Sequence, residues 1–334
     1  MSGHVLGIDT GGTKTMAAVA DQTGRILAVG TGGPGNPDGV GLAKAQAGYD
    51  QAIREALAGA GGAVPDAVFV GSGGVVTEDG RDQVRRLLEP SLGPAARAAL
   101  VDHDCRVALA GGLAGRPGIV LIAGTGTSCF GRLTQGREWL ASGWGSLFGD
   151  EGSAHWLALE GVRAVLWAED GRGPRTALRE ALLPALGISH PLQILDGTGE
   201  GRWDRTAIAA LAPLVVAAAE AEDAVAAGLV DQAGEHLAAD IGAVARALEL
   251  GQAPGGFEVA LVGGLLRAAA IRQALTAAVA RDFPRARLVQ PQLAPVAGAV
   301  LLALAQLAGC EPDQLPAGAI GHLEASSRTF GLHP

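Results

Sequence analysis

The pattern of hydrophobic and polar positions predicts three short strands at the start of the chain. Each apolar run is too short for a helix and is separated from the next by glycine-rich or polar turn residues, which is typical of an antiparallel meander. The predicted strands cover residues 5–9, 15–20 and 25–30. Helices and buried strands then alternate, which favours a sheet with parallel crossovers. These elements are a helix at 40–60, a strand at 67–71, a helix near 79–88 and a strand that ends at Asp104.

The same order of elements begins again after residue 118. The pattern predicts strands at 119–123, 129–133 and 138–142, helical stretches at 150–167 and 206–250, strands at 257–264 and 287–290, and a helix from Pro295. Two units of three strands followed by alternating helix and strand indicate a weak internal duplication. We therefore expect an α/β fold of two domains. The expected domains are residues 1–115 and residues 116–334, the second with helical insertions and with a last helix able to pack back on the first.

Length and composition fit a globular protein of two domains. A chain of 334 residues exceeds the size at which a single hydrophobic core usually stops growing. Hydrophobic residues make up 48% and charged residues 18%, which excludes a disordered chain. The formal net charge of −9 opposes binding to nucleic acid, so no nucleic-acid partner is expected.

Neither a membrane helix nor a signal peptide is expected. The longest uncharged run, which ends at Cys310, falls short of the ~18 apolar residues that a membrane helix needs. The first residues run straight into a strand and lack the charged and apolar regions of a signal peptide. The three cysteines, Cys105, Cys129 and Cys310, show no CxxC spacing, which argues against disulfides and a zinc site. These features favour a cytoplasmic protein.

A glycine-rich turn with the sequence GIDTGGTKT joins the first two predicted strands. The strand places Asp9 at the rim of the sheet, where its carboxylate is able to hold Mg²⁺ through water. Gly11 and Gly12 permit positive φ angles and allow backbone N–H groups to face an anion. The candidate phosphate-binding residues of this turn are Thr10, Gly11, Gly12, Thr13 and Lys14. An ordinary hairpin turn is the alternative interpretation.

A second glycine-threonine loop, AGTGTS, follows the first strand of the second unit. Neither loop is a Walker loop or a strand-to-helix GxGxxG turn, but their repetition favours two loops that hold one triphosphate. The candidate residues of the second loop are Gly124, Thr125 and Gly126. A further pair, Gly263 and Gly264, ends a buried strand, where the backbone is able to approach adenine or ribose closely. A helix entry that needs small residues explains this pair equally well.

Four motifs in this order, GIDTGGTKT, AGTGTS, SGWGSLFGDEGSAHW and LVGG, resemble the N-acetylglucosamine kinase branch of the BadF/BadG-type ATPase family. The resemblance extends from residue 6 to about residue 307. It implies an actin/hexokinase-like (ribonuclease H-like) fold, with two duplicated βββαβαβα domains around a nucleotide and sugar cleft. It also implies a homodimer that uses ATP and Mg²⁺ to phosphorylate the 6-hydroxyl of an amino sugar. N-acetylglucosamine is the expected sugar, and glucosamine is the alternative.

The same resemblance implies the residues of a sugar site. The implied sugar-binding residues are Asn36, Asp104, Trp144, Gly145, Asp150 and Glu151. Asp104 takes the position of the catalytic base, and Asp102, two residues away, is the alternative. Asp150 is also able to cap the helix that follows, with Ser153 as the other capping candidate. Ser142 stands where the family usually has a second glycine.

Other classes of function share parts of this pattern. Activator ATPases of the same superfamily hold an iron–sulfur cluster with cysteines at a dimer interface, whereas Cys105 and Cys129 are expected beside the active site. A sugar sensor without catalysis is another class, but no helix-turn-helix pattern precedes the first strand. A related group of sugar kinases carries a zinc-binding CxCGxxGC cluster, which this sequence lacks. His103 and His155 have no partner at metal-ligand spacing, so we expect ordinary half-buried or surface histidines.

Overall fold

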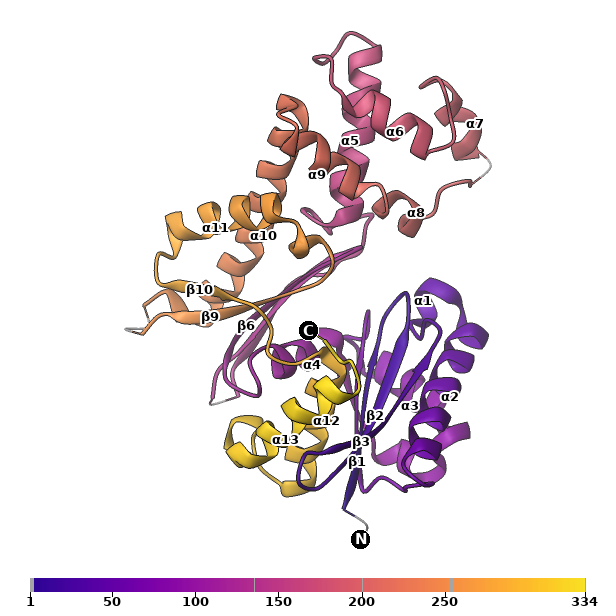
Figure 1. The fold of residues 1–334 in the computed structure, drawn as a ribbon, viewed down its shortest axis with the longest axis vertical. Helices are drawn as coiled ribbons and strands as arrows, with labels where there is room; N and C mark the ends of the chain where they lie inside the picture. The colour runs from indigo at the N-terminus through magenta and orange to yellow at the C-terminus, as the bar shows by residue number, and fades with distance from the viewer. Residues whose placement is uncertain (1–2, 135, 200, 253–254, 334) are drawn as a thin grey trace. The chain divides into compact units, whose positions relative to one another are not determined.

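Two five-stranded sheets organise the chain (Figure 1). The computed structural model describes residues 3–134, 136–199, 201–252 and 255–333. The chain divides into two units. The first unit comprises Met1–Val120, Phe130–Arg137 and Val289–Pro334, and the second comprises Leu121–Cys129 and Glu138–Leu288.

The first sheet has the strand order β3-β2-β1-β4-β5. Its strands are β1 (His4–Thr10), β2 (Thr15–Asp21), β3 (Ile26–Gly32), β4 (Ala67–Ser72) and β5 (Leu100–His103). β2 lies antiparallel to β1 and β3, whereas β4 lies parallel to β1 and β5 lies parallel to β4. The structure therefore confirms both the meander and the parallel strands that the hydrophobic pattern predicts.

Helices enclose the first sheet and form two hydrophobic cores with it. One core includes α2 and α3, and the other includes α4, α12 and α13. The bounds of the helices in this unit are α1 (Pro37–Val40), α2 (Leu42–Gly59), α3 (Glu78–Leu92), α4 (Asp104–Gly112), α12 (Pro295–Ala308) and α13 (Ala317–Thr329). Because both faces of the sheet are covered, every residue of β4 is buried and the strand is apolar without alternation.

α12 is apolar on every side because the first sheet and α4 enclose it. Residues 296–305 of this helix are buried without interruption. A Cβ atom on Gly7 of β1 would lie 2.3 Å from the backbone nitrogen of Val300. A Cβ atom on Gly298 would lie 2.0 Å from the carbonyl oxygen of Val107 in α4. Glycine is therefore required at both positions for the backbones to approach so closely.

The C-terminal segment lies in the first unit, whereas the domains expected from the sequence divide at residues 115 and 116 and allow the last helix to pack back on the first. The unit includes Val289–Pro334, so the chain returns to it after the second unit. Chain order alone suggests that this segment continues the second domain. The glycine contacts of α12 explain why it does not, since a helix this apolar needs a partner on each side and finds β1 and α4.

The second sheet has the strand order β10-β9-β6-β7-β8. Its strands are β6 (Gly118–Ala123), β7 (Thr127–Arg132), β8 (Glu138–Ser142), β9 (Phe257–Val262) and β10 (Ala286–Val289). When the order is read from β8, each strand takes the place of one strand of the first sheet, with β6 in the position of β1. This correspondence supports the predicted duplication.

The helical part of the second unit is more divided than the hydrophobic pattern indicates. Its helices are α5 (Ala154–Glu169), α6 (Leu178–Ala185), α7 (Gln193–Gly199), α8 (Arg205–Ala209), α9 (Ala212–Glu220), α10 (Ala224–Ala247) and α11 (Ala269–Asp282). The helix expected over 206–250 is thus three helices. Pro213 stands at the start of α9, and Asp223 caps α10 by accepting from the Ala226 N–H, so both residues set new helix starts. Among the described residues, no helix is long and apolar enough to cross a membrane.

Candidate active site

The turn between β1 and β2 forms an exposed loop at the edge of the first sheet. The strands pair up to Thr10 and Thr15, and the Gly11 N–H donates to the carbonyl oxygen of Lys14 over 3.1 Å. The exposed residues of this loop are Gly12, Thr13 and Lys14. A Cβ atom on Gly11 or Gly12 would meet no atom within 4 Å. Neither glycine has the positive φ angle expected from the sequence, so their contribution is open space in front of the backbone N–H groups.

Thr10 lies on the inner side of this loop and is 1% exposed. Its hydroxyl lies 2.7 Å from the hydroxyl of Thr15, and a second hydrogen bond joins it to Tyr49. The hydroxyl of Thr10 therefore holds the base of the loop, whereas the sequence pattern suggested a phosphate donor. Thr13 is the exposed threonine of the loop.

The segment after β3 lies against the same loop. The N–H groups of Gly35 and Asn36 both donate to the carbonyl oxygen of Gly11, over 3.2 and 3.4 Å. A Cβ atom on Gly35 would lie 2.2 Å from the hydroxyl oxygen of Thr10, so only glycine permits this approach. The structure thus brings Asn36, which is half-buried, next to the first loop.

Asp104 is the first residue of α4 and directly follows β5. Because β1, β4 and β5 run parallel, their carboxyl ends meet at one edge of the sheet, and Asp9 lies at this edge on β1. Gly73 follows β4 there and donates its N–H to the carbonyl oxygen of Thr10 over 3.0 Å. A Cβ atom on Gly73 would lie 3.3 Å from the Asp104 carboxylate and 3.7 Å from the Cα atom of Gly11. The Asp104 carboxylate therefore lies beside the first loop.

The surroundings of Asp9 and Asp104 disfavour a negative charge. Burial, with the charge of Asp104 as a second cause, raises the pKa of Asp9 to about 7, although Lys14 opposes the shift. Burial also raises the pKa of Asp104, against hydrogen bonds from Cys105. A cation beside two such carboxylates would offset their repulsion, so the pair fits a hydrated divalent ion such as Mg²⁺.

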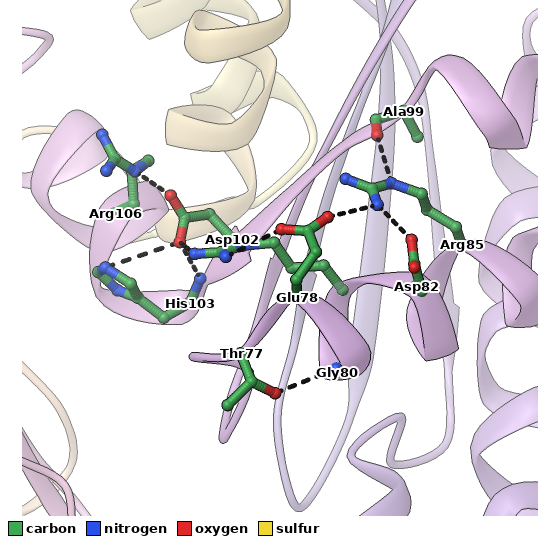
Figure 2. A network of polar contacts seen from close by, with 10 residues as sticks. Thr77, Glu78, Gly80, Asp82, Arg85, Ala99, Asp102, His103 and Arg106 are labelled. Atoms are coloured by element: carbon green, nitrogen blue, oxygen red, sulfur yellow. Dashed lines mark hydrogen bonds and ion pairs between the residues drawn. The ribbon is translucent and has the colours of Figure 1, made fainter.

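Asp102 lies in a network of hydrogen bonds and ion pairs (Figure 2). Its carboxylate accepts from Arg106, from Arg81 over 3.3 Å and from the backbone N–H of His103 over 2.8 Å. Burial alone would raise the pKa of Asp102, but the charge of Arg106 and these further contacts hold it below its ordinary value. A carboxylate engaged by two arginines is a poor proton acceptor, so the geometry favours Asp104 over Asp102 as the base.

The second loop joins β6 and β7 and contacts the start of α5. The Gly124 N–H donates to the carbonyl oxygen of Gly126 over 2.9 Å, and the Ala154 N–H donates to the carbonyl oxygen of Gly124 over 2.9 Å. A Cβ atom on Gly124 would meet no atom within 4 Å, whereas one on Gly126 would lie 2.2 Å from the Arg205 guanidinium. A side chain at Gly126 would therefore displace the Arg205 guanidinium and crowd the Asp150 carboxylate. Gly124 and the half-buried Thr125 leave room for a ligand.

Asp150 is 2% exposed and lies directly behind this loop. Its carboxylate accepts from the Thr127 N–H over 3.2 Å and from Arg205 over 2.5 Å. Ser153, not Asp150, caps α5, because the Ser153 hydroxyl accepts from the Trp156 N–H. Arg205 lies 55 residues further along the chain than Asp150, so no local sequence pattern predicts their pairing.

The segment between β8 and Asp150 carries the other implied sugar residues. Trp144 is 78% exposed, Glu151 is exposed, and Gly145 has a φ of 80°, which favours glycine. Ser142 also has a left-handed φ, of 63°, which explains why a glycine is common at this position in the family. These residues lie in one stretch of chain that is open to a ligand.

The glycine pair after β9 divides into two roles. Gly263 has a φ of 117°, and its Cβ atom would lie 2.3 Å from the carbonyl oxygen of Ala123 on β6. Packing between these two strands is therefore sufficient to explain Gly263. A Cβ atom on Gly264 would meet no atom within 4 Å, so this position is open to a ligand.

Asp240 on α10 is an acidic residue that the sequence pattern does not single out. It accepts a hydrogen bond from Ser142, while its Oδ2 atom is buried and has no hydrogen-bond partner among the described residues. Burial, together with the charges of Glu151 and Asp150, raises the pKa of Asp240 to about 7. Asp240 lies about a hundred residues further along the chain than Ser142, so only the fold reveals the contact between them.

The cysteines and histidines do not form a metal or redox centre among the described residues. Cys105 and Cys129 are buried and belong to the first and second unit respectively. No group of three or more His, Cys, Asp or Glu residues within the described ranges could hold a metal ion. His103 and His155 are buried rather than at the surface. A magnesium ion at Asp9 would therefore keep water and phosphate ligands, as this ion commonly does.

A family model supplies the identification of this chain. The model of the BadF/BadG/BcrA/BcrD ATPase family matches residues 6–303. The chain belongs to this family. The resemblance carried by the four motifs is thereby confirmed. The two matching sheets and the solved structures of similar proteins also confirm the actin/hexokinase-like fold of this BadF/BadG-type ATPase.

Curated relatives of this BadF/BadG-type ATPase are sugar kinases by name. An N-acetylmuramic acid/N-acetylglucosamine kinase of Clostridium acetobutylicum is 28% identical over 249 residues, which are 74% of this chain and 81% of the relative. An N-acetyl-D-glucosamine kinase of Dictyostelium discoideum is 28% identical over 313 residues, which are 90% of this chain and 97% of the relative. A solved structure from Chromobacterium violaceum, assigned by its description to the N-acetylglucosamine kinases, is 31% identical with a TM-score of 0.71 and covers 90% of this chain and 98% of its own.

Proposed function

We propose that this chain is an ATP-dependent kinase that transfers the γ-phosphoryl group of ATP to the 6-hydroxyl of N-acetylglucosamine. One observation carries the proposal: the Asp104 carboxylate lies beside the first loop at the carboxyl edge of the sheet, 3.3 Å from the Cβ position of Gly73. This places a proton acceptor next to a loop suited to phosphate. The family membership and the names of the relatives support the same reaction.

Asp104 acts as the general base in this proposal. A sugar hydroxyl is a weak nucleophile, and a carboxylate that accepts its proton during attack contributes roughly 10²- to 10⁴-fold to the rate. Burial raises the pKa of Asp104, which makes its carboxylate a stronger proton acceptor. The proton passes from the 6-hydroxyl to the Asp104 carboxylate while the new phosphorus–oxygen bond forms and the bond to ADP breaks.

The two glycine-threonine loops bind the phosphates in this proposal. In the first loop, Gly12 offers a backbone N–H group, Gly11 leaves open space beside it, and the exposed Thr13 and Lys14 offer a hydroxyl and a positive charge. In the second loop, Thr125 and Gly126 offer backbone N–H groups and Gly124 leaves open space beside them, while Gly264 leaves room for adenosine. Asp9 would hold Mg²⁺ through water. When bound, Mg²⁺ supplies charge neutralisation at the phosphate oxygens.

Polar groups with fixed positions recognise the sugar in this proposal. Asn36 is held by its backbone against the first loop, so its amide is positioned before the substrate arrives. Trp144 offers an exposed aromatic face, and Glu151 offers an exposed carboxylate. Asp150 has both carboxylate oxygens engaged by Thr127 and Arg205, and each oxygen keeps a second lone pair for a sugar hydroxyl.

Release of ADP in the presence of different sugars tests the proposed function. The purified protein with ATP and Mg²⁺ should release ADP with N-acetylglucosamine, and phosphorus NMR of the product should show a 6-phosphate. Glucosamine, N-acetylmuramic acid and glucose are the comparison sugars, and faster turnover with any of them would move the substrate assignment to that sugar. Absence of sugar-dependent ADP release with all four would overturn the proposed function.

The homodimer and the cytoplasmic location stay predictions. The family resemblance implies the homodimer. One chain has a mass of 33.4 kDa, so sedimentation equilibrium at several concentrations should measure a mass near twice this value. A single species at the mass of one chain at every concentration would contradict it.

A further inference from the structure

A network of ion pairs surrounds Asp102 at the point where β5 ends and α4 begins (Figure 2). The Oδ2 atom of Asp102 accepts from Nε of Arg106, four residues further along the chain. The Oδ1 atom accepts from the backbone N–H of His103 over 2.8 Å and from Arg81 of α3 over 3.3 Å. The side chain of Asp102 is 16% exposed and that of Arg106 is 18% exposed, so these charges are only weakly screened by solvent. One carboxylate therefore ties the first turn of α4 to α3.

The network continues along α3 in the direction away from α4. Glu78 pairs with Arg81 over 3.3 Å and with Arg85 over 2.9 Å, and Asp82 pairs with Arg85 over 2.5 Å. Glu78 is 65% exposed and Asp82 is 52% exposed, so these outer pairs contribute little to stability. Arg85 therefore belongs to the same network but makes no contact with Asp102.

An aromatic ring closes the other side of the network. Phe130 of β7 is 1% exposed and packs against the ring of His103, with ring centroids 4.6 Å apart. The guanidinium of Arg106 lies over the same ring at 5.3 Å from its centroid. Contact with Phe130 on one side and Asp102 on the other defines the position of the Arg106 guanidinium.

Asp104 directly follows β5 and makes no ion pair to any arginine among the described residues. The thiol of Cys105 approaches its Oδ1 atom at 3.7 Å, and burial dominates its environment. Arg106 is only two residues away in the chain. A guanidinium that paired with Asp104 would occupy the lone pairs that have to accept the hydroxyl proton.

We propose that Asp102 is a positioning residue for the base: by engaging Arg81 and Arg106 it keeps both guanidinium groups away from Asp104 and holds the first turn of α4 in place. This inference rests on the proposed kinase function. The two carboxylates therefore have different roles. Asp102 compensates the charges of the arginines, and Asp104 remains open to the substrate.

The test is a double-mutant cycle on Asp102 and Arg106. Asp102→Asn keeps the size of the side chain and its ability to accept from the His103 N–H, but it removes the negative charge. We expect the turnover number with N-acetylglucosamine to fall roughly 10- to 100-fold, as for a misplaced or blocked catalytic group, with the KM for ATP nearly unchanged. Adding Arg106→Gln removes the released guanidinium, so the double variant should turn over several-fold faster than Asp102→Asn alone. Arg85→Gln, at the outer end of the network, is the matched control and should keep the parent turnover.

The outcomes separate this inference from a structural role and from the proposed function itself. A merely structural role for Asp102 predicts that the double variant, which has lost two tethers, is slower than Asp102→Asn, and that result would overturn the inference. Parent-like turnover of Asp102→Asn in an otherwise active kinase would overturn it as well. An inactive parent protein with every sugar would instead overturn the proposed function, and this inference with it. Thermal unfolding of each variant confirms that the compared proteins are folded at the assay temperature.

Discussion

Four aspartates of this chain show how the surroundings of a side chain determine its chemistry. Asp102 is engaged by two arginines, and its pKa lies below the ordinary value. Asp104 and Asp9 pair with no arginine among the described residues, and burial raises the pKa of both, although Lys14 opposes the shift at Asp9. Asp240 is raised in the same way on another helix. The proposed base is thus distinguished by the absence of a compensating charge rather than by its position in a motif.

Asp240 permits a prediction about stability at the scale of one residue. Burial and the charges of Glu151 and Asp150 raise its pKa from 3.8 to about 7, while Ser142 donates a hydrogen bond to it. Between these two values the folded protein binds a proton that the unfolded chain has lost, so this group lowers the free energy of unfolding as the pH rises from about 4 to about 7. Asp240→Asn removes the charge and should raise the melting temperature at pH 8 more than at pH 5.

Differential scanning calorimetry of the parent and the variant at both pH values measures this effect. Asp231→Asn, an exposed change on the same helix, is the control and should shift the melting temperature equally at the two pH values. An advantage over the parent that is equal at pH 5 and pH 8 would contradict the prediction, because it would show that Asp240 is already ionised at pH 5 in the folded state.

The sequence predicts the site residues that lie next to a recognisable local pattern. It does not predict those that reach the site only through the packing of distant segments. Asp9 lies near the end of β1 and Asp104 directly follows β5, so their place at the edge of the sheet follows from the chain itself. Arg205 and Asp240 lie on helices whose faces are set by distant packing, and no local signal reports their contacts with Asp150 and Ser142. Gly73 could have been predicted from the sequence, because the small residues after β4 indicate that another part of the backbone approaches closely there.

At the scale of elements, the contact between α4 and α12 sets the place of the proposed base, because Asp104 is the first residue of α4. The contact depends on glycines on both helices. A Cβ atom on Gly298 would lie 2.0 Å from the Val107 carbonyl oxygen and 2.4 Å from the nitrogen of Gly111. The helix start itself was not predicted from the sequence, since an apolar strand and an apolar helix follow one another without a turn residue.

The Gly298→Ala change tests the importance of this contact. Alanine normally stabilises a helix interior by about 1 kcal/mol relative to glycine. At Gly298 the added methyl group meets backbone atoms that have no room to move, so we expect the opposite sign and a loss of about 1–3 kcal/mol. Gly321→Ala in α13 is the matched control, because its Cβ atom would meet nothing within 4 Å and the change should stabilise or leave stability unaltered. Chemical denaturation of both variants gives the two values, and equal effects would contradict the packing described for α12.

At the scale of the whole molecule, two sheets with corresponding strand orders each offer a glycine-threonine loop between their first two strands. The first unit adds Asp9, Asn36 and Asp104 to its loop, and the second adds Asp150 to its own. The duplication could be predicted from the sequence, because the strands of both units appear as short apolar runs in the same order. The position of α12 in the first unit was expected only as an option, because it depends on which surface a helix fits rather than on the order of the chain.

The account depends most on Asp104 as the base of sugar phosphorylation. The decisive measurement is the turnover number of Asp104→Asn with N-acetylglucosamine, together with its dissociation constant for ATP. We expect turnover to fall by about 10²- to 10⁴-fold, because asparagine has the same shape but accepts no proton, while ATP binding stays within a few-fold of the parent. Turnover close to that of the parent protein, with ATP still bound, would contradict the central claim and place the base elsewhere.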